Sequence, residues 1–294
     1  MSARLALLGH PLHQSVSPAI QQAAMAATGI EGRYRLLDVL PEDLPRALDL
    51  VRRGELLGCN VTMPYKEAVV GLLDALDEDA AAIRAVNTVT REGASLVGHN
   101  TDAYGVRRTI EVLLEGHAPG AASAVVIGAG GTGRSATYGL LRSGFGRIVV
   151  YNRHVERAER LVADLSGVAP TTRLVARPLE DPALGDELAR ADLLLNASSA
   201  GLNSDESPLP ASLLPPGIRV FDVVYSPRDT RLLRDARAAG AAATANGESM
   251  VVHQGARAFE LWFGRTAPVE EMMAALNRAM EARAAASAPA ATGR

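Results

Sequence analysis

The sequence predicts an α/β protein of two domains, each built on an open sheet of mostly parallel strands with helices on its faces. Short apolar runs of strand length alternate with helical patterns in both halves of the chain. A glycine-rich turn at 128–133 follows one of these runs and opens a helix. The length of 294 residues also exceeds what one hydrophobic core usually serves.

The first half of the chain contains the elements of one α/β domain. An apolar run at 4–8 ends at Gly9 and is typical of a buried strand. Ser17 is placed to cap the next helix, and Pro18 suits its first position. Strands are expected at 4–8, 34–39 and 57–62, a hairpin at 87–90 and 95–99, and helices at 18–28, 41–53 and 67–76.

The second half repeats the alternation, and the chain then returns to the first domain. Helices are expected at 104–114, 155–165, 231–239, 250–263 and 269–284, with another that follows the glycine-rich turn at 128–133 and ends at Ser143. Strands are expected at 124–127, 147–151, 193–196 and 219–223. The first domain is predicted to comprise 1–103 plus 247–284, and the second 104–246. Residues 285–294, rich in Ala, Ser, Pro and Gly, are expected to form a disordered tail.

Composition excludes several classes of protein. The net charge is −3 and no long basic run occurs, which argues against nucleic-acid binding. Cys59 is the only cysteine, so an intrachain disulfide and a cysteine-based metal site are excluded, and no metal site is expected. The start is not typical of a secretory signal, and no apolar stretch has the length of a membrane helix. We expect a cytoplasmic protein without a membrane partner, either a monomer or a homodimer.

The turn Gly128-x-Gly130-x-x-Gly133 predicts a dinucleotide site in a Rossmann-type second domain. Its glycines allow a tight turn, close approach of the backbone to a pyrophosphate, and close helix–strand packing. The helix start then offers N–H groups to phosphates. The alternative is a plain tight turn.

The end of the next strand favours NADP over NAD as the cofactor. An Asp or Glu would bond the ribose 2′-hydroxyl there, but this chain has Asn152, Arg153 and His154, with Arg157 one helical turn on. Two guanidinium groups suit a 2′-phosphate. The alternative is that both arginines are solvated surface residues.

A stiff polar loop, Asn-Val-Thr-Met-Pro-Tyr-Lys at 60–66, supplies the first candidate for chemistry. Pro64 fixes its own φ and biases Met63 toward an extended conformation. Lys66 lies at the start of the helix expected at 67–76, where the helix dipole favours anions. The same field lowers the cost of a neutral amine, which suits a lysine that exchanges a proton.

Three further polar clusters follow first-domain strands, where ligands bind in open α/β sheets. They are Ser-Val-Ser-Pro at 15–18, Ala-Val-Asn-Thr at 85–88, and Gly-His-Asn-Thr-Asp at 98–102. Taken singly, Ser17 and Asp102 are helix caps and Asn87 is a turn residue. His13 and His99 flank these motifs and are interpreted as supporting or surface residues.

Taken together and in this order, the loop at 60–66 and the three clusters resemble shikimate dehydrogenase. The resemblance runs from Gly9 to about Met280. It includes Asn-Ala-Ser-Ser-Ala-Gly at 196–201, Asp-Val-Val-Tyr-Ser-Pro at 222–227 and Gly247-x-x-Met250-x-x-x-Gln254. It implies reversible, NADPH-dependent reduction of 3-dehydroshikimate to shikimate.

The resemblance also assigns roles to residues. Lys66 would be the general acid/base, with Asp102 beside it at the reacting oxygen. The substrate positions would be Ser15, Ser17, Thr62, Lys66, Asn87, Asp102, Tyr225 and Gln254. The cofactor positions would be Gly128, Ala129, Gly130, Gly131, Thr132, Asn152, Arg153, His154, Arg157, Val223, Gly247 and Met250, with Glu78 added on the resemblance alone.

Two other functions stay open. One is a relative acting on quinate or on an aminated shikimate, with NAD or NADP; Asn152 and Arg153 argue against NAD, and Ser17 favours shikimate. The other is a non-catalytic nucleotide-binding regulatory protein, against which the intact Lys66 and Asp102 argue. His154, Arg84 and Ser249 depart from the family pattern, which commonly has Thr, Gly and Gly there.

Overall fold

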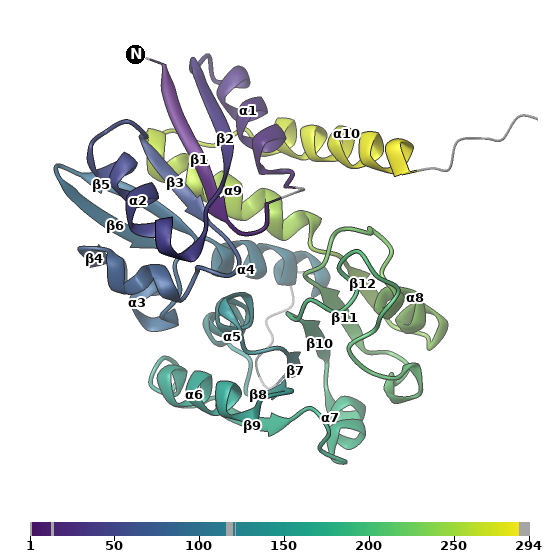
Figure 1. Cartoon of the computed structure of the whole chain (residues 1–294). Helices are drawn as coiled ribbons and strands as arrows, with labels where there is room; N and C mark the ends of the chain where they lie inside the picture. The colour runs from purple at the N-terminus through teal and green to yellow at the C-terminus, as the bar shows by residue number, and fades with distance from the viewer. Residues whose placement is uncertain (1, 13–14, 116–119, 121, 288–294) are drawn as a thin grey trace, which may run out of the picture.

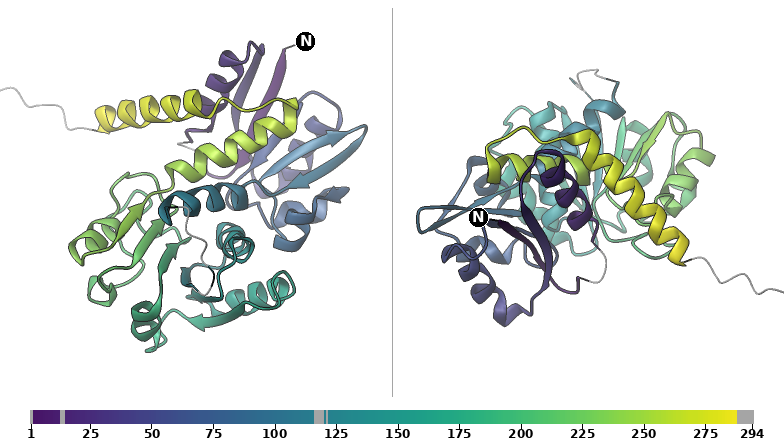
Figure 2. Two further views of the ribbon diagram at one scale, coloured as in Figure 1. Left: turned by 180° about the vertical axis from the view of Figure 1, so that it is seen from behind. Right: turned by 90° about the horizontal axis from the view of Figure 1, so that it is seen from above.

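The computed structural model describes residues 2–12, 15–115, 120 and 122–287. Within them the strands form two six-stranded sheets, one in each half of the chain, with α4 (Asp102–Leu113) and α9 (Glu248–Phe263) between them (Figures 1 and 2). None of the helices in this described part has the length and apolar character that crossing a bilayer requires.

The other elements of the first half alternate much as expected. They are β1 (Ala3–Gly9), α1 (Ser17–Ala27), β2 (Gly32–Asp38), the 3-10 helix η1 (Pro41–Asp43), α2 (Leu44–Arg52), β3 (Gly58–Val61), the 3-10 helix η2 (Ala68–Leu72), β4 (Ala75–Leu76), α3 (Glu78–Ile83), β5 (Thr88–Glu92) and β6 (Ser95–His99).

The second half continues the alternation. It contains β7 (Ser123–Ile127), α5 (Gly131–Ser143), β8 (Arg147–Asn152), α6 (Val155–Leu165), β9 (Arg173–Pro178), α7 (Leu184–Arg190), β10 (Leu193–Asn196), the 3-10 helix η3 (Ala211–Leu213), β11 (Arg219–Asp222), α8 (Arg231–Ala238), β12 (Ala243–Ala245) and α10 (Val269–Ser287).

The first sheet is mixed and has the order β2-β1-β3-β5-β6-β4. β1 pairs in parallel with β2 and β3, so that Leu5 lies opposite both Tyr34 and Gly58. The β5–β6 hairpin runs antiparallel to β3. The parallel strands end where the loop at 60–66 begins, which places that loop at the carboxyl edge of the sheet.

The second sheet is wholly parallel and has the order β12-β11-β10-β7-β8-β9. The chain starts in the middle at β7, winds outward to β9, and then returns to β10 on the other side. The direction of winding reverses between β7 and β10, and ligands bind at such a switch point in open α/β sheets. The predicted Rossmann-type domain is confirmed by this topology and by the structural neighbours described below.

The C-terminal helices pack on the first domain, as expected. Phe259, Trp262 and Met272 share a buried cluster with Leu5 and Ile20. Figure 1 shows α10 beside α1. The indole of Trp262 donates to the carbonyl of Val89 at 3.1 Å, which ties α9 to the hairpin. α10 extends to Ser287, beyond the expected end at 284, and the rest of the expected tail lies outside the described residues.

The prediction of a helix at 67–76 is wrong. The segment forms only the 3-10 helix η2, and then β4 pairs in parallel with β6. The carboxylate of Asp74 explains the change, because it accepts from the amide of Leu96 at 2.7 Å and from Arg52 at 2.7 Å. These contacts attach the chain to the sheet, and tertiary contacts of this kind override a helical pattern. The α-helix dipole expected beside Lys66 is therefore absent.

Besides β4, five elements were not predicted: α3, β9, α7, η3 and β12. α3 carries a sequence signal, since Asp77 caps it by accepting from the amide of Ala80 at 2.7 Å. The predicted cap at Ser17 is wrong, because Ser17 is the first residue of α1 and Val16 precedes it without a side-chain cap. Asp102 is likewise the first residue of α4, where Asn100 accepts from the amide of Ala103 at 3.1 Å.

Candidate active site

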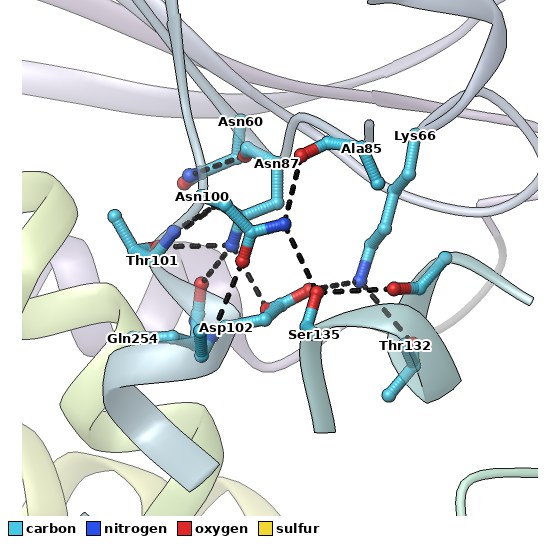
Figure 3. A network of polar contacts seen from close by, with 12 residues as sticks. Asn60, Lys66, Ala85, Asn87, Asn100, Thr101, Asp102, Thr132, Ser135 and Gln254 are labelled. Atoms are coloured by element: carbon cyan, nitrogen blue, oxygen red, sulfur yellow. Dashed lines mark hydrogen bonds and ion pairs between the residues drawn. The ribbon is translucent and has the colours of Figure 1, made fainter. Parts of the chain in front are cut away.

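The centre of the site is an ion pair between Lys66 and Asp102. The Nζ of Lys66 lies 2.5 Å from Oδ2 of Asp102, and the two side chains are 15% and 6% exposed. Nζ also lies 3.4 Å from the hydroxyl of Thr132, at the start of α5 in the second domain (Figure 3). The loop after β3 and the start of α4 therefore bring both predicted groups together, directly against the second domain.

Lys66 is also the only lysine of the chain, and every other Lys or Arg position is an arginine. A guanidinium stays protonated in proteins, whereas an ammonium can release its proton. Among the basic Lys and Arg side chains, the only one that can exchange a proton thus lies in the pair with Asp102.

Asn87 holds the carboxylate of Asp102. Its Nδ2 donates to Oδ1 of Asp102 at 2.9 Å, to the hydroxyl of Thr101 at 2.9 Å and to Oε1 of Gln254 at 3.3 Å. Its Oδ1 accepts from the amide of Thr101 at 2.7 Å, which fixes the orientation of the side-chain amide. The predicted positions Asn87, Asp102 and Gln254 thus form one network, in which Asn87 and Asp102 are buried and Gln254 is half-buried (Figure 3).

A chain of hydrogen bonds joins this network to α1. Asn60 donates to the carbonyl of Asn87 at 3.0 Å and accepts from the hydroxyl of Tyr34 at 2.7 Å. Burial and the neighbouring Cys59 raise the pKa of Tyr34, while a hydrogen bond with the side chain of Ser17 lowers it. Contiguous contacts therefore connect Ser17 with Asp102.

Ser15, Ser17 and Tyr225 gather at the start of α1. The hydroxyls of Ser15 and Ser17 lie 3.1 Å apart. Burial raises the pKa of Tyr225, whereas Arg283 and the backbone of Val16 lower it, so Tyr225 lies beside the same segment. Thr62 lies at the end of β3, where a side chain at Gly9 would meet its methyl group at 2.5 Å. The expected substrate positions thus border the carboxyl edge of the first sheet.

The glycine-rich turn has the close packing that its pattern predicts. Gly128 has a φ of 108°, and a Cβ at Gly133 would lie 2.2 Å from the carbonyl oxygen of Gly128. A Cβ at Gly131 would meet the side chain of Lys66 at 3.0 Å. At Gly128 and Gly133 the turn therefore has room for backbone alone, and Lys66 lies against it at Gly131.

At the end of β8, Asn152 shapes the turn, whereas the two arginines that follow it are side chains at the surface. Asn152 accepts from the amide of Ala129 at 3.1 Å and donates to the carbonyl of His154 at 2.8 Å, so it shapes the turn itself. Arg153 is exposed, and among the described residues it contacts no carboxylate. Arg157 donates to Glu67 of the first domain at 3.2 Å.

Of the other residues predicted on the cofactor side, three lie close together and Glu78 lies apart from the glycine turn. Val223, Gly247 and Met250 lie close together, because a Cβ at Gly247 would meet the carbonyl oxygen of Val223 at 2.0 Å and Met250 lies in the first turn of α9, which Gly247 directly precedes. Glu78 is exposed at the start of α3, and no contact in the described part of the chain joins it to the glycine turn.

Several residues of the network were not singled out from the sequence. Asn100 donates to the carbonyl of Ala85 at 2.8 Å and to the hydroxyl of Ser135 at 2.9 Å, which joins the two domains. Thr101 was visible only as part of the cluster at 98–102. Nothing in the sequence signals Ser135, since its role depends on how α5 packs against α4.

The structure also accounts for Arg84 and His99. Arg84 has a φ of 55°, which explains why glycine commonly stands at its position. His99 is buried and bonds Asp77 and Thr90, each at 2.8 Å, so it supports the fold beside the site. His13 lies outside the described residues.

Three family models match the chain. The shikimate dehydrogenase substrate binding domain matches residues 7–89, the shikimate / quinate 5-dehydrogenase model matches 116–204, and the shikimate 5′-dehydrogenase C-terminal domain matches 247–276.

Whole-chain comparisons agree with these models. The NADP(+) shikimate dehydrogenase of Moorella thermoacetica is 42% identical, covering 95% of this chain and 94% of that protein. The shikimate 5-dehydrogenase of Thermus thermophilus, solved with NADP(H) and shikimate, is 39% identical with a TM-score of 0.82, covering 94% of this chain and 99% of that one. The quinate dehydrogenase of Corynebacterium glutamicum, solved with NAD, is 33% identical with a TM-score of 0.86, covering 94% and 99%. The chain belongs to the shikimate dehydrogenase family.

Proposed function

We propose that this chain is an NADP-dependent shikimate dehydrogenase, which reversibly reduces 3-dehydroshikimate to shikimate. The observation that carries the proposal is the buried Lys66–Asp102 pair at the glycine turn of the second domain. Relatives about 40% identical over most of the chain carry the name NADP(+) shikimate dehydrogenase.

In the proposed reaction NADPH supplies the hydride, and Lys66 supplies the proton. Reduction of a ketone places negative charge on its oxygen, which needs a proton donor within hydrogen-bond reach. Lys66 gives that proton and takes it back during shikimate oxidation. Asp102 holds the ammonium in place, and Asn87 holds Asp102.

The substrate would lie between this pair and the start of α1. Hydroxyls of Ser15 and Ser17 near a helix start suit a carboxylate. Thr62, Asn87, Tyr225 and Gln254 would meet the ring hydroxyls. A site made of neutral donors and acceptors rejects analogues that lack a hydroxyl, because its own polar groups would stay unpaired.

The residues of the second domain fit a phosphorylated dinucleotide. Side chains are excluded where Gly133 approaches Gly128, which leaves backbone amides for the pyrophosphate. Arg153 and Arg157 would hold the 2′-phosphate, with His154 beside them, while Val223, Gly247 and Met250 would border the nicotinamide. We have no physical account of Glu78 at this site.

A second candidate is a quinate dehydrogenase that uses NAD, which the similarity to the Corynebacterium glutamicum enzyme favours. Arg153 argues against it, since an exposed guanidinium suits a 2′-phosphate better than a free 2′-hydroxyl. In either case we expect cytoplasmic action on small molecules, without nucleic acid or membrane, as a monomer or homodimer.

A spectrophotometric screen tests both candidates by following reduced nicotinamide while crossing shikimate and quinate with NADP and NAD. We expect kcat/KM for shikimate to be at least tenfold higher with NADP than with NAD, a difference of about 1.4 kcal/mol. Equal efficiencies with both cofactors would contradict the NADP assignment, and a preference for quinate with NAD would select the second candidate.

A further inference from the structure

Glu67, which directly follows Lys66, forms an ion pair with Arg157 in the other domain. Oε1 of Glu67 lies 3.2 Å from Nη2 of Arg157, and the two side chains are 45% and 47% exposed. Glu67 precedes η2 on the first domain, while Arg157 lies in the first turn of α6. The pair therefore joins the two domains beside the catalytic candidate.

The same guanidinium lies over the glycine turn. A Cβ at Gly130 would lie 3.9 Å from Nη2 of Arg157, with no other atom within 4 Å apart from its chain neighbours. Arg153 contacts no carboxylate in the described part of the chain. The two arginines proposed to hold the 2′-phosphate thus differ, since one is available and the other is bound to a carboxylate.

We infer that Glu67 competes with the 2′-phosphate of NADP for Arg157. The inference rests on the proposed function, because it takes Arg157 as a 2′-phosphate ligand. A carboxylate and a phosphate oxygen use the same N–H donors of a guanidinium. Cofactor binding therefore exchanges one partner for the other and breaks the contact between the loop of Lys66 and α6. NAD, which lacks the phosphate, leaves the pair intact.

The opposite end of α6 shows what this exchange would leave in place. Asp164 accepts from Arg84 at 3.0 Å and from Arg134 at 2.6 Å, and the Arg134 side chain is only 6% exposed. Arg134 also donates to the carbonyl of Ile83 at 2.5 Å. The buried Arg134 of α5, together with Arg84 at the end of α3, holds this end of α6, so loss of the exposed Glu67 pair frees only the end nearest the site.

Calorimetric titration of the full-length protein with NADP⁺ and NAD⁺ tests the inference. An exposed ion pair changes an equilibrium constant by at most a few fold. We expect Glu67→Gln to bind NADP⁺ about two- to fivefold more tightly, with NAD⁺ affinity unchanged. Titration with 2′,5′-ADP against 5′-ADP should show the same selectivity without the nicotinamide.

Two comparisons make the result specific. Glu92→Gln removes the same charge from the exposed end of β5 and should leave both affinities unchanged. In an Arg157→Ala background, Glu67→Gln should have no effect on NADP⁺ affinity, because the group it competes for is gone. A gain of the same size in that background would overturn the inference.

The remaining outcomes separate the inference from the function on which it rests. If Arg157→Ala weakens NADP⁺ binding while Glu67→Gln leaves it unchanged or weaker, the competition is wrong and the 2′-phosphate assignment stands. If Arg153→Ala and Arg157→Ala both leave NADP⁺ binding unchanged, the 2′-phosphate assignment itself fails.

Discussion

The ammonium of Lys66 lies between a carboxylate of one domain and a hydroxyl of the other. The carboxylate of Asp102 is held in place by a hydrogen bond from Asn87. Thr132 lies in the first turn of α5, the helix that would face the cofactor. A proton donor paired with a carboxylate that Asn87 itself holds needs less motion before reaction.

The sequence predicted most side chains of this network but not the contact that joins them to α1. Lys66, Asp102, Asn87 and Gln254 were named and lie together. The link through Tyr34 was not foreseen, because it depends on the pairing of β1 with both β2 and β3. Motifs predict side chains that follow one strand, whereas contacts across strands require the register.

Cys59 provides a test of burial at a single residue beside this network. It is fully buried in β3, and burial raises the pKa of its thiol to about 12. Because the thiolate is the reactive form, the native protein should not react with Ellman's reagent at about pH 8. After denaturation in guanidinium one thiol per chain should react, and rapid stoichiometric reaction of the native protein would contradict the packing of β3.

The turn between β7 and α5 shows how an element shapes the site. Gly128, with its positive φ, and Gly133 were both predicted from spacing alone, and the structure shows the physical reason in the approach of Gly133 to the Gly128 carbonyl. The segment at 67–76 behaved differently, because a contact of Asp74 with another strand decided its conformation. The geometry of the glycine turn is therefore encoded in the local sequence, whereas the conformation of 67–76 depends on a contact with a distant strand.

Gly133→Ala tests the turn. The added methyl group would overlap the Gly128 carbonyl oxygen, so we expect the free energy of unfolding to fall by about 1–3 kcal/mol or more, with loss of NADP⁺ binding. Urea denaturation and calorimetric titration measure both effects. The matched control is Gly167→Ala, where the methyl group meets nothing within 4 Å and stability should change by less than about 0.5 kcal/mol. Equal stability of the two variants would argue against this packing.

The whole molecule is two sheets joined through shared helices. Val106 and Ile110 of α4 lie in the same buried cluster as Val126, Ala136 and other residues of the second domain. α9 and α10 return to the first. The alternation of strands and helices predicted both sheets, and the motif at 247–254 indicated that the C-terminal helices belong to the first domain. The sharing of α3 and α4 between domains was not predicted, since helical patterns do not say which sheet a helix covers.

Joining the domains in this way brings the only lysine of the chain against the cofactor turn, and the central claim is that Lys66 transfers the proton. Kinetics of Lys66→Arg and Lys66→Ala, with shikimate and NADP⁺ binding measured by calorimetry, test it most directly. Arginine keeps the charge beside Asp102 but cannot release a proton at neutral pH.

The account predicts that both variants bind shikimate and lose at least about a hundredfold in kcat, the scale of general acid–base catalysis. Turnover by Lys66→Arg within a few fold of the unaltered enzyme would show that the site needs only a positive charge. Near-normal turnover by Lys66→Ala would remove Lys66 from the mechanism.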